Sequence, residues 1–260
     1  MDARSSLFVS HGAPSLLLDG GPSADFLKSL GKRISKPKAV ICLSAHWESR
    51  EPLFTSAKQM DTIHDFYGFP EEMYRLRYPA MGNPELAQRG VELCKVVGID
   101  AGLESSRGLD HGAWVPLMAL FPDVDVPVVQ VSLPFVHGPR AVYALGKALE
   151  PLKREGVLLL GSGGFTHNLG ALAWGGGETP AWASEFHAWT SAALRENRLE
   201  DLFEAATCAP HFSRNHPRVE HWLPLFFALG AGGHPWGAET LHTGFEYGSL
   251  AMDAFAFSPT

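Results

Sequence analysis

The chain has 260 residues, of which 45% are hydrophobic and 19% charged, and its formal net charge is −7. This balance is typical of a globular protein with a sizeable core and excludes wholesale disorder, and α/β folds of this length often form one domain. We therefore expect residues 1–260 to form a single domain. The negative net charge and the lack of a Lys/Arg run exclude nucleic acid as an expected partner.

We expect no membrane-spanning segment and no secretory signal in this chain. Its longest apolar stretches, such as 157–160 and 223–230, are far shorter than the roughly 20 residues that cross a bilayer. Residues 1–4 lead directly into the apolar segment 7–9, without the basic and long apolar regions of a secretory signal. A cytoplasmic protein is therefore expected. The three widely spaced cysteines predict no disulfide framework, so the 12 histidines are the expected ligands of any metal.

Short apolar runs alternate with helical patterns along the chain. In chain order, the pattern predicts a strand at 7–10, a helix at 23–34, a strand at 39–44, a helix at 84–97, a strand at 126–133, a helix at 139–154, a strand at 156–160, a helix at 183–206 and a proline-interrupted helix at 217–230. The tail, 241–257, carries a weak strand pattern. This alternation predicts an α/β fold with a mostly parallel central sheet and helices on both faces.

Three predicted strands run into short polar or glycine-containing turns that carry a histidine. His11 follows the first strand, His46 the second, and His167 comes after the glycine-rich stretch 161–164. Ligands of open α/β sheets bind beyond the carboxyl ends of the strands, so these imidazoles can converge on one point. We therefore expect a metal site at this edge, although a single histidine in such a loop can also be purely structural.

The glycine-rich stretch before His167 allows a second interpretation, a phosphate-binding loop. The stretch lacks both the Lys-Ser/Thr ending of a P-loop and the GxGxxG spacing, so phosphate binding is disfavoured. In the predicted helix 217–230, helical geometry points Glu220 and His221 in different directions, so only one ligand is expected from this segment. His221 is preferred, and Glu220 is the alternative.

Two further histidines lie in loops. His111 follows Asp110, which can simply cap the apolar helix that comes next. His64 begins an aromatic segment, His64-Asp65-Phe66-Tyr67-Gly68-Phe69-Pro70, which is suited to line a pocket for a flat substrate or to form a hydrophobic lid. The histidines at 137, 187, 211, 234 and 242 are interpreted as surface or structural residues.

Six motifs in order resemble the DOPA-dioxygenase branch of the class III extradiol ring-cleavage dioxygenases. The resemblance spans residues 7 to about 255 and is carried by Ser10-His11-Gly12-Ala13-Pro14, Ser44-Ala45-His46-Trp47, His64-Asp65-Phe66-Tyr67-Gly68-Phe69-Pro70, Gly108-Leu109-Asp110-His111-Gly112-Ala113-Trp114, Gly161-Ser162-Gly163 with Thr166-His167-Asn168, and Glu220-His221-Trp222-Leu223-Pro224-Leu225.

The resemblance implies an Fe(II) enzyme that opens a catechol ring, such as that of DOPA, with O₂, and Zn²⁺ is an alternative bound ion. It implies His11, His46 and His221 as metal ligands, with His221 where the wider class has a glutamate, and leaves Glu220 or His167 as further ligands. It also implies His167 as the acid/base residue and His111 as a second catalytic histidine.

The site also needs residues that contact the substrate and residues that hydrogen-bond the imidazoles of the metal ligands. His64, Phe66 and Tyr67 are the predicted substrate-binding residues, and Asp65, Asp110 and Glu48 are candidate partners for the ligand imidazoles. Two other functions share these residues: a redox-inactive binding protein on the same fold, and a zinc hydrolase in which His167 or Glu220 serves as base. The oligomeric state is not predicted.

Overall fold

The strands at the centre of the computed structural model present alternate side chains to two apolar layers, as the period of a buried strand requires. In the strand at 39–49, Val40 and Cys42 pack in one core cluster, whereas Ile41 and Leu43 pack in the other. The structure describes residues 5–260, so residues 1–4, which entered the targeting prediction, lie outside it.

The described residues form one α/β unit built around a large sheet. The strands are β1 (Ser6–Ser10), β2 (Ala39–Ser49), β3 (Leu53–Thr55), β4 (Gly102–Glu104), β5 (Val128–Pro134), β6 (Val157–Gly163), β7 (Trp236–His242), β8 (Phe245–Glu246), β9 (Leu250–Ala251) and β10 (Ala254–Pro259). The large sheet has the order β4-β3-β5-β2-β6-β1-β10-β7, and β8 pairs with β9. Its centre, β5-β2-β6-β1, is parallel, while β10 and β7 extend it in antiparallel fashion.

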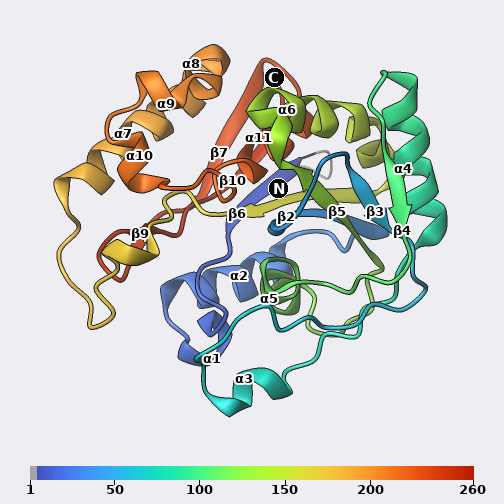
Figure 1. Ribbon diagram of the computed structural model, residues 1–260, viewed down its shortest axis with the longest axis horizontal. Coiled ribbons are helices and arrows are strands. Elements are labelled where there is room, and N and C mark those ends of the chain that lie inside the picture. The colour runs from blue at the N-terminus through green and yellow to red at the C-terminus, as the bar shows by residue number, and fades with distance from the viewer. Residues whose placement is uncertain (1–4) are drawn as a thin grey trace.

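Helices cover both faces of this sheet. They are α1 (Leu16–Asp19), α2 (Pro22–Arg33), α3 (Glu71–Arg75), α4 (Pro84–Val96), α5 (His111–Leu120), α6 (Gly138–Leu149), α7 (Ala181–Arg195), α8 (Leu199–Phe203), α9 (Ala205–Cys208), α10 (Phe212–Asn215) and α11 (Pro224–Gly232), with 3₁₀ turns at Phe135–His137, Glu150–Glu155 and Leu169–Ala171. In Figure 1, α6 and α11 lie above the sheet and α2 and α5 below it. The predicted fold class is confirmed, and no helix within 5–260 is long and apolar enough to cross a bilayer.

Three of the predicted helices end earlier or begin later than expected. The helix predicted at 183–206 is three helices, α7 to α9, and α7 ends before Asn197, whose left-handed φ of 55° a continuing helix does not allow. The helix predicted at 139–154 stops at Leu149 and continues as a 3₁₀ turn that contains Pro151. The helix predicted at 217–230 begins only at Pro224, which takes the first helical position, so His221 lies in the preceding turn.

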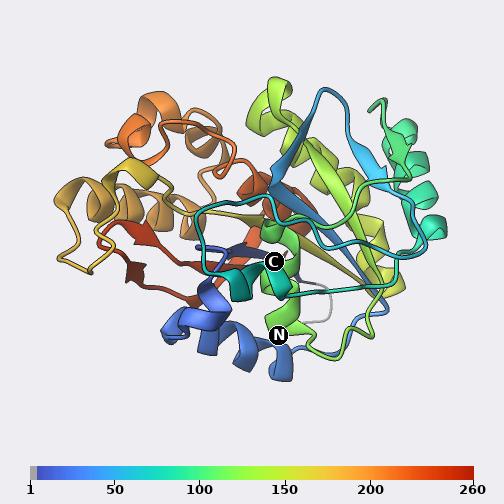
Figure 2. The ribbon, with the colours of Figure 1, turned by 60° about the horizontal axis from the view of Figure 1, so that its bottom comes forward.

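The carboxyl ends of β1, β2 and β6 lie side by side, because β6 pairs in parallel with both of its neighbours. In Figure 2 the segment between β3 and α4, which contains α3, lies in front of these strands. The weak strand pattern of the tail corresponds to the short hairpin of β8 and β9 and to β10, which pairs with β1. Segments from both halves of the chain therefore meet at one edge of the sheet.

Candidate metal centre

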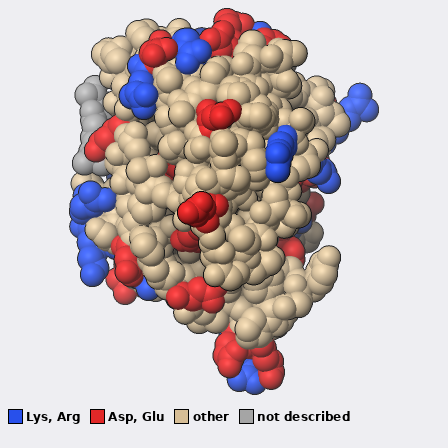
Figure 3. All heavy atoms as spheres, turned by 90° about the vertical axis from the view of Figure 1, so that its left-hand side faces the viewer, with Lys and Arg blue, Asp and Glu red and all other residues tan. Residues whose placement is uncertain are grey.

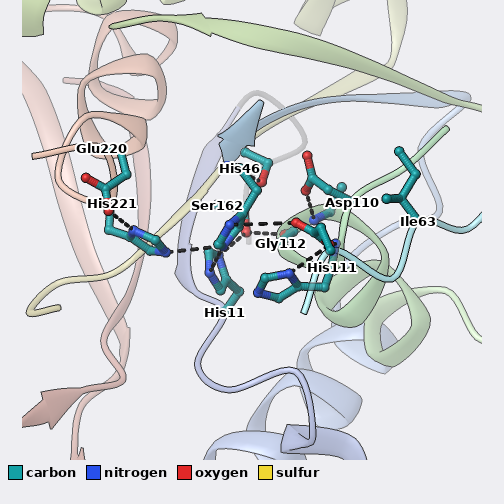
Figure 4. Close-up of polar contacts among 12 residues, drawn as sticks. His11, His46, Ile63, Asp110, His111, Gly112, Ser162, Glu220 and His221 are labelled. Atoms are coloured by element: carbon teal, nitrogen blue, oxygen red, sulfur yellow. Dashed lines mark hydrogen bonds and ion pairs between the residues drawn. The ribbon is translucent and has the colours of Figure 1, made fainter. Parts of the chain in front are cut away.

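Three histidines from distant parts of the chain meet at this edge. His11 directly follows β1, His46 lies within β2, and His221 lies in the turn before α11. The end of β6 joins two of these segments, because the backbone N–H of His11 donates to Gly163 O at 3.0 Å and that of Gly164 donates to His221 O at 2.9 Å. Figure 4 shows the three rings turned toward one another.

The Nε2 atoms of the three rings form a compact donor set. The Nε2 atom of His46 lies 3.1 Å from that of His11 and 3.2 Å from that of His221, and the ligand atoms of all three residues lie within 4.8 Å of one another. Two nitrogens that bind one ion at about 2.1 Å and at a right angle are separated by about 3 Å. The three-imidazole set therefore fits a single divalent ion.

Hydrogen bonds at the opposite nitrogens orient two of these rings. The Ser162 hydroxyl donates to the Gly112 carbonyl, so its oxygen is free to accept a hydrogen bond from His11 Nδ1, 3.1 Å away. His221 Nδ1 lies 2.9 Å from the Glu220 Oε1 atom, which can only accept while the carboxylate is ionised. Both contacts place the proton on Nδ1 and leave the Nε2 lone pair for a metal.

Asp65 lies between His46, the third ligand, and the neighbouring His111. Its Oδ1 atom accepts hydrogen bonds from the backbone N–H of His111 and from His111 Nδ1, both at 2.9 Å, while its Oδ2 atom lies 3.7 Å from His46 Nδ1. Burial opposes ionisation of Asp65, but the bonds from His111 outweigh it and hold the carboxyl pKa at about 2. Asp65 is therefore a carboxylate that connects His46 with His111.

His111 and His167 flank the three-histidine set. The ring centroid of His111 lies 4.0 Å from that of His46, and the ring of His167 stacks on His221 with 3.4 Å between centroids and 7° between planes. His167 Nδ1 also lies 4.0 Å from Glu220 Oε1. All five predicted metal and catalytic histidines therefore lie together, with Glu220 beside His167 and His221.

Burial favours the neutral form of four of these imidazoles, those of His11, His46, His167 and His221. It is the largest effect on each ring, and it lowers the pKa of His46 to about 3 and that of His167 to about 4. Burial, reinforced by the neighbouring imidazoles, also lowers the pKa of His11 and His221 well below the usual value. Neutral imidazoles retain the lone pair that metal binding requires.

Glycines allow this close approach of backbone and rings. A Cβ atom on Gly163 would lie 2.3 Å from His221 O, and one on Gly112 would lie 2.4 Å from Ser44 Oγ and 2.8 Å from His46 Cδ2. The glycine-rich stretch 161–164, which could also be interpreted as a phosphate-binding loop, therefore has a structural role. It lets the turn that carries His221 pack directly against β6.

The two other acidic candidates form no hydrogen bond or ion pair with the rings of His11, His46 and His221. Asp110 caps α5 by accepting from Ala113 N at 3.2 Å, and it also accepts from the side chains of Gln130 and Arg107. The Arg107 guanidinium in turn donates to the carbonyl of His46 at 3.3 Å. The expectation that Asp110 holds an imidazole directly is therefore wrong. It fixes the helix that carries His111.

Glu48, the other acidic candidate, forms an ion pair with Arg218 at the cavity wall, and Arg218 Nε also lies 3.3 Å from Glu220 Oε2. The expectation that Glu48 holds a ligand imidazole is also wrong. Ser162 and Glu220 hold imidazoles instead, as the contacts above show. In the sequence, Ser162 lies between the predicted strand 156–160 and His167. Only the folded chain shows that its hydroxyl faces His11.

A cavity of about 640 Å³ opens above the histidines. Phe66 and Tyr67, two of the predicted substrate-binding residues, line it, whereas the third, His64, is absent from its wall. The Nε2 atom of His64 lies 3.0 Å from the Leu76 carbonyl, and its ring packs edge-on against Phe66. His64 therefore supports the aromatic loop from outside the cavity.

Comparison with known proteins identifies relatives that match nearly the full length of the chain. Residues 6–257 match the family model of the catalytic LigB subunit of aromatic ring-opening dioxygenase. The chain is 40% identical to a 4,5-DOPA dioxygenase extradiol of Beta vulgaris over 99% of this chain and 97% of the relative. It is 35% identical to a protein of the same name from Escherichia coli K12, over 95% of this chain and 92% of the relative.

A solved structure has the same fold. An uncharacterised protein from Escherichia coli K12 superimposes with a TM-score of 0.82 at 31% identity, over 97% of this chain and 98% of that one. The family implies a non-haem metal, and the three-histidine set provides a site for it. The full-length match confirms the resemblance drawn from the six motifs: the chain belongs to the LigB family of aromatic ring-opening dioxygenases, within the class III extradiol enzymes.

Proposed function

We propose that the protein opens the ring of a DOPA-like catechol with O₂, using a divalent iron held by His11, His46 and His221. The observation that carries this proposal is the convergence of the three Nε2 atoms, 3.1 and 3.2 Å apart, at the floor of the cavity. Three neutral imidazoles suit both Fe(II) and Zn²⁺, and only the first supports oxygen chemistry.

The bound ion would supply positive charge for a catecholate and a site at which the catechol and O₂ meet. The protein's own residues orient the ring and move its protons. His167 is the base in this proposal, because burial keeps its imidazole unprotonated and it stands beside the ligand set. Glu220, 4.0 Å from His167 Nδ1, can stabilise the imidazolium that forms.

His111 would act from the other side of the cavity. Asp65 accepts the hydrogen bond from His111 Nδ1, so Nε2 of this ring is left as the atom that can contact a substrate hydroxyl or oxygen. Phe66 and Tyr67 line the same cavity, and Phe66 suits the flat face of a catechol ring. In this arrangement the ring lies between the histidine floor and the aromatic loop.

The first experiment combines metal analysis with catalysis. Protein prepared without oxygen and loaded with Fe(II) is expected to take up O₂ with DOPA and to form a yellow ring-opened product. The His11→Ala and His46→Ala variants are expected to lose both metal and activity. The surface variant His137→Ala, whose side chain is 42% exposed, is expected to retain both.

The base is tested separately. His167→Ala is expected to keep the metal but to lose about 10²–10⁴-fold in rate, the usual contribution of a positioned proton acceptor. Loss of metal in this variant would instead make His167 a ligand. Zinc-dependent hydrolysis without O₂ uptake, or tight catechol binding without turnover, would support the hydrolase or the binding protein and overturn the dioxygenase.

A further inference from the structure

Exposed apolar side chains surround the mouth of the cavity. Tyr67 is 93% exposed, Trp174 60% and Leu169 59%, and all three line the opening. Single exposed apolar residues are common, but a cluster of large ones around a cavity marks a ligand or protein contact. Segment 169–180 lies at the left of Figure 1, and Figure 3, which faces that side, shows uncharged surface between scattered acidic and basic side chains.

Part of this rim is held in place by the fold. The ring centroids of Trp174 and Tyr247 lie 5.0 Å apart at 49°, and the backbone N–H of Ala173 donates to the Tyr247 carbonyl at 2.9 Å. Tyr247 has a φ of 48°, in the left-handed region that a bulky aromatic residue rarely adopts. Such strain persists only where the surrounding structure enforces it and is frequent at ligand sites.

The cavity is larger than one catechol ring requires. A catechol has six carbon and two oxygen atoms, whereas about 640 Å³ is within the range of sites that enclose drug-sized ligands. If the two hydroxyls face the histidines at the floor, a substituent on the ring reaches toward the mouth. The side chains that it meets there are those of Tyr67, Trp174 and Tyr247.

The charged side chains of the cavity already have partners. Arg218 pairs with Glu48 and lies beside Glu220, while Asp65 accepts hydrogen bonds from His111. At the mouth itself, the large side chains of Trp174 and Tyr247 offer a substituent apolar and stacking contact.

We propose that the cavity mouth is a second binding subsite for an aromatic group joined to the catechol, so that a catechol with an aromatic substituent is turned over better than one with a small alkyl substituent. This inference rests on the ring-opening function proposed above. It assigns Trp174, with Tyr247 and Tyr67, as specificity-determining residues. Stacking and apolar burial at the mouth would stabilise the extended substrate without affecting the reacting ring.

The test compares 4-methylcatechol with 4-benzylcatechol by O₂ uptake in the Fe(II)-loaded protein. We expect kcat/KM to be about tenfold higher for the benzyl compound. Trp174→Ala should lower that ratio to within about twofold by reducing turnover of the benzyl compound alone, and Trp174→Phe should preserve it. Tyr67→Ala, at a more exposed position, should also lower the ratio.

Val96→Ala is the control, because Val96 is 82% exposed on α4 and does not line the cavity. An equal kcat/KM for both catechols, or equal losses for both in Trp174→Ala, would overturn the subsite. A Trp174→Ala protein with altered mass in light scattering and an unchanged ratio would identify a contact between chains instead. If no catechol is opened, the proposed function fails rather than the subsite.

Discussion

Ser162 shows how one hydroxyl can set the protonation of a ligand. A serine has one proton to donate, and that of Ser162 goes to the Gly112 carbonyl. Its oxygen can therefore serve His11 Nδ1 only as an acceptor, which leaves His11 Nε2 unprotonated and free for a metal. The tautomer of a ligand is thus determined by a residue that never touches the ion.

Replacing Ser162 by alanine should weaken metal binding. Ser162→Ala removes the acceptor that orients His11, and loss of such an outer contact usually costs 10–100-fold in metal affinity. Competition with a chelator of known affinity measures the change, and Ser184→Ala, exposed on α7, is the matched control. Equal affinities in the two variants would contradict the proposed role.

Among the elements, β6 is the one on which the ligand set is assembled. It pairs with β1 and β2, whose ends carry His11 and His46, and its glycines let the turn before α11 approach with His221. Pro224 begins α11 directly after this turn. A small shift of the turn against β6 would therefore move one ligand relative to the other two.

A methyl group on β6 should produce such a shift. In Gly163→Ala the new Cβ would lie 2.3 Å from the His221 carbonyl oxygen, closer than real Cβ contacts allow, so the turn must move. We expect a loss of metal affinity of about tenfold or more, measured by the same chelator competition, and destabilisation by about 1–3 kcal/mol in urea unfolding. Gly175→Ala, where no atom lies within 4 Å of the added methyl group, should behave like the unaltered protein.

For the molecule as a whole, the buried histidines connect folding to pH. His216 is fully buried with its Nε2 atom 3.2 Å from the Phe165 carbonyl, and burial lowers its pKa to about 3. The unfolded chain takes up this proton near pH 6.5, whereas the folded chain does not. Stability therefore falls as the pH drops below about 6.5 and continues to fall toward the folded-state pKa.

Replacing the titrating imidazole of His216 should make the free energy of unfolding less dependent on pH below pH 7. In His216→Gln, an amide can still donate to Phe165 O but takes up no proton. Between pH 7 and pH 5, the unaltered protein should lose about 2 kcal/mol more of its unfolding free energy than the variant. Urea unfolding of metal-free protein at both pH values measures this, with the exposed-site variant His137→Gln as control. Parallel losses in the two variants would show that His216 does not contribute.

The sequence by itself determined the fold class, the four central strands and the histidines that the structure brings together. Those features follow from local periodicity and from motifs at strand ends, which neighbouring residues encode. Helix ends were predicted less well where a proline begins the helix, as at Pro224, or where a residue with left-handed φ follows its end, as at Asn197.

Only the tertiary structure decided which groups serve these histidines. Ser162, Glu220 and Asp65 orient the rings, while Asp110 and Glu48, equally plausible in sequence, hold a helix and an arginine instead. The aromatic rim likewise joins residues 67, 174 and 247, which no local pattern links. Hydrogen bonds and stacking act over a few ångströms, so their partners are chosen only when distant segments have packed together.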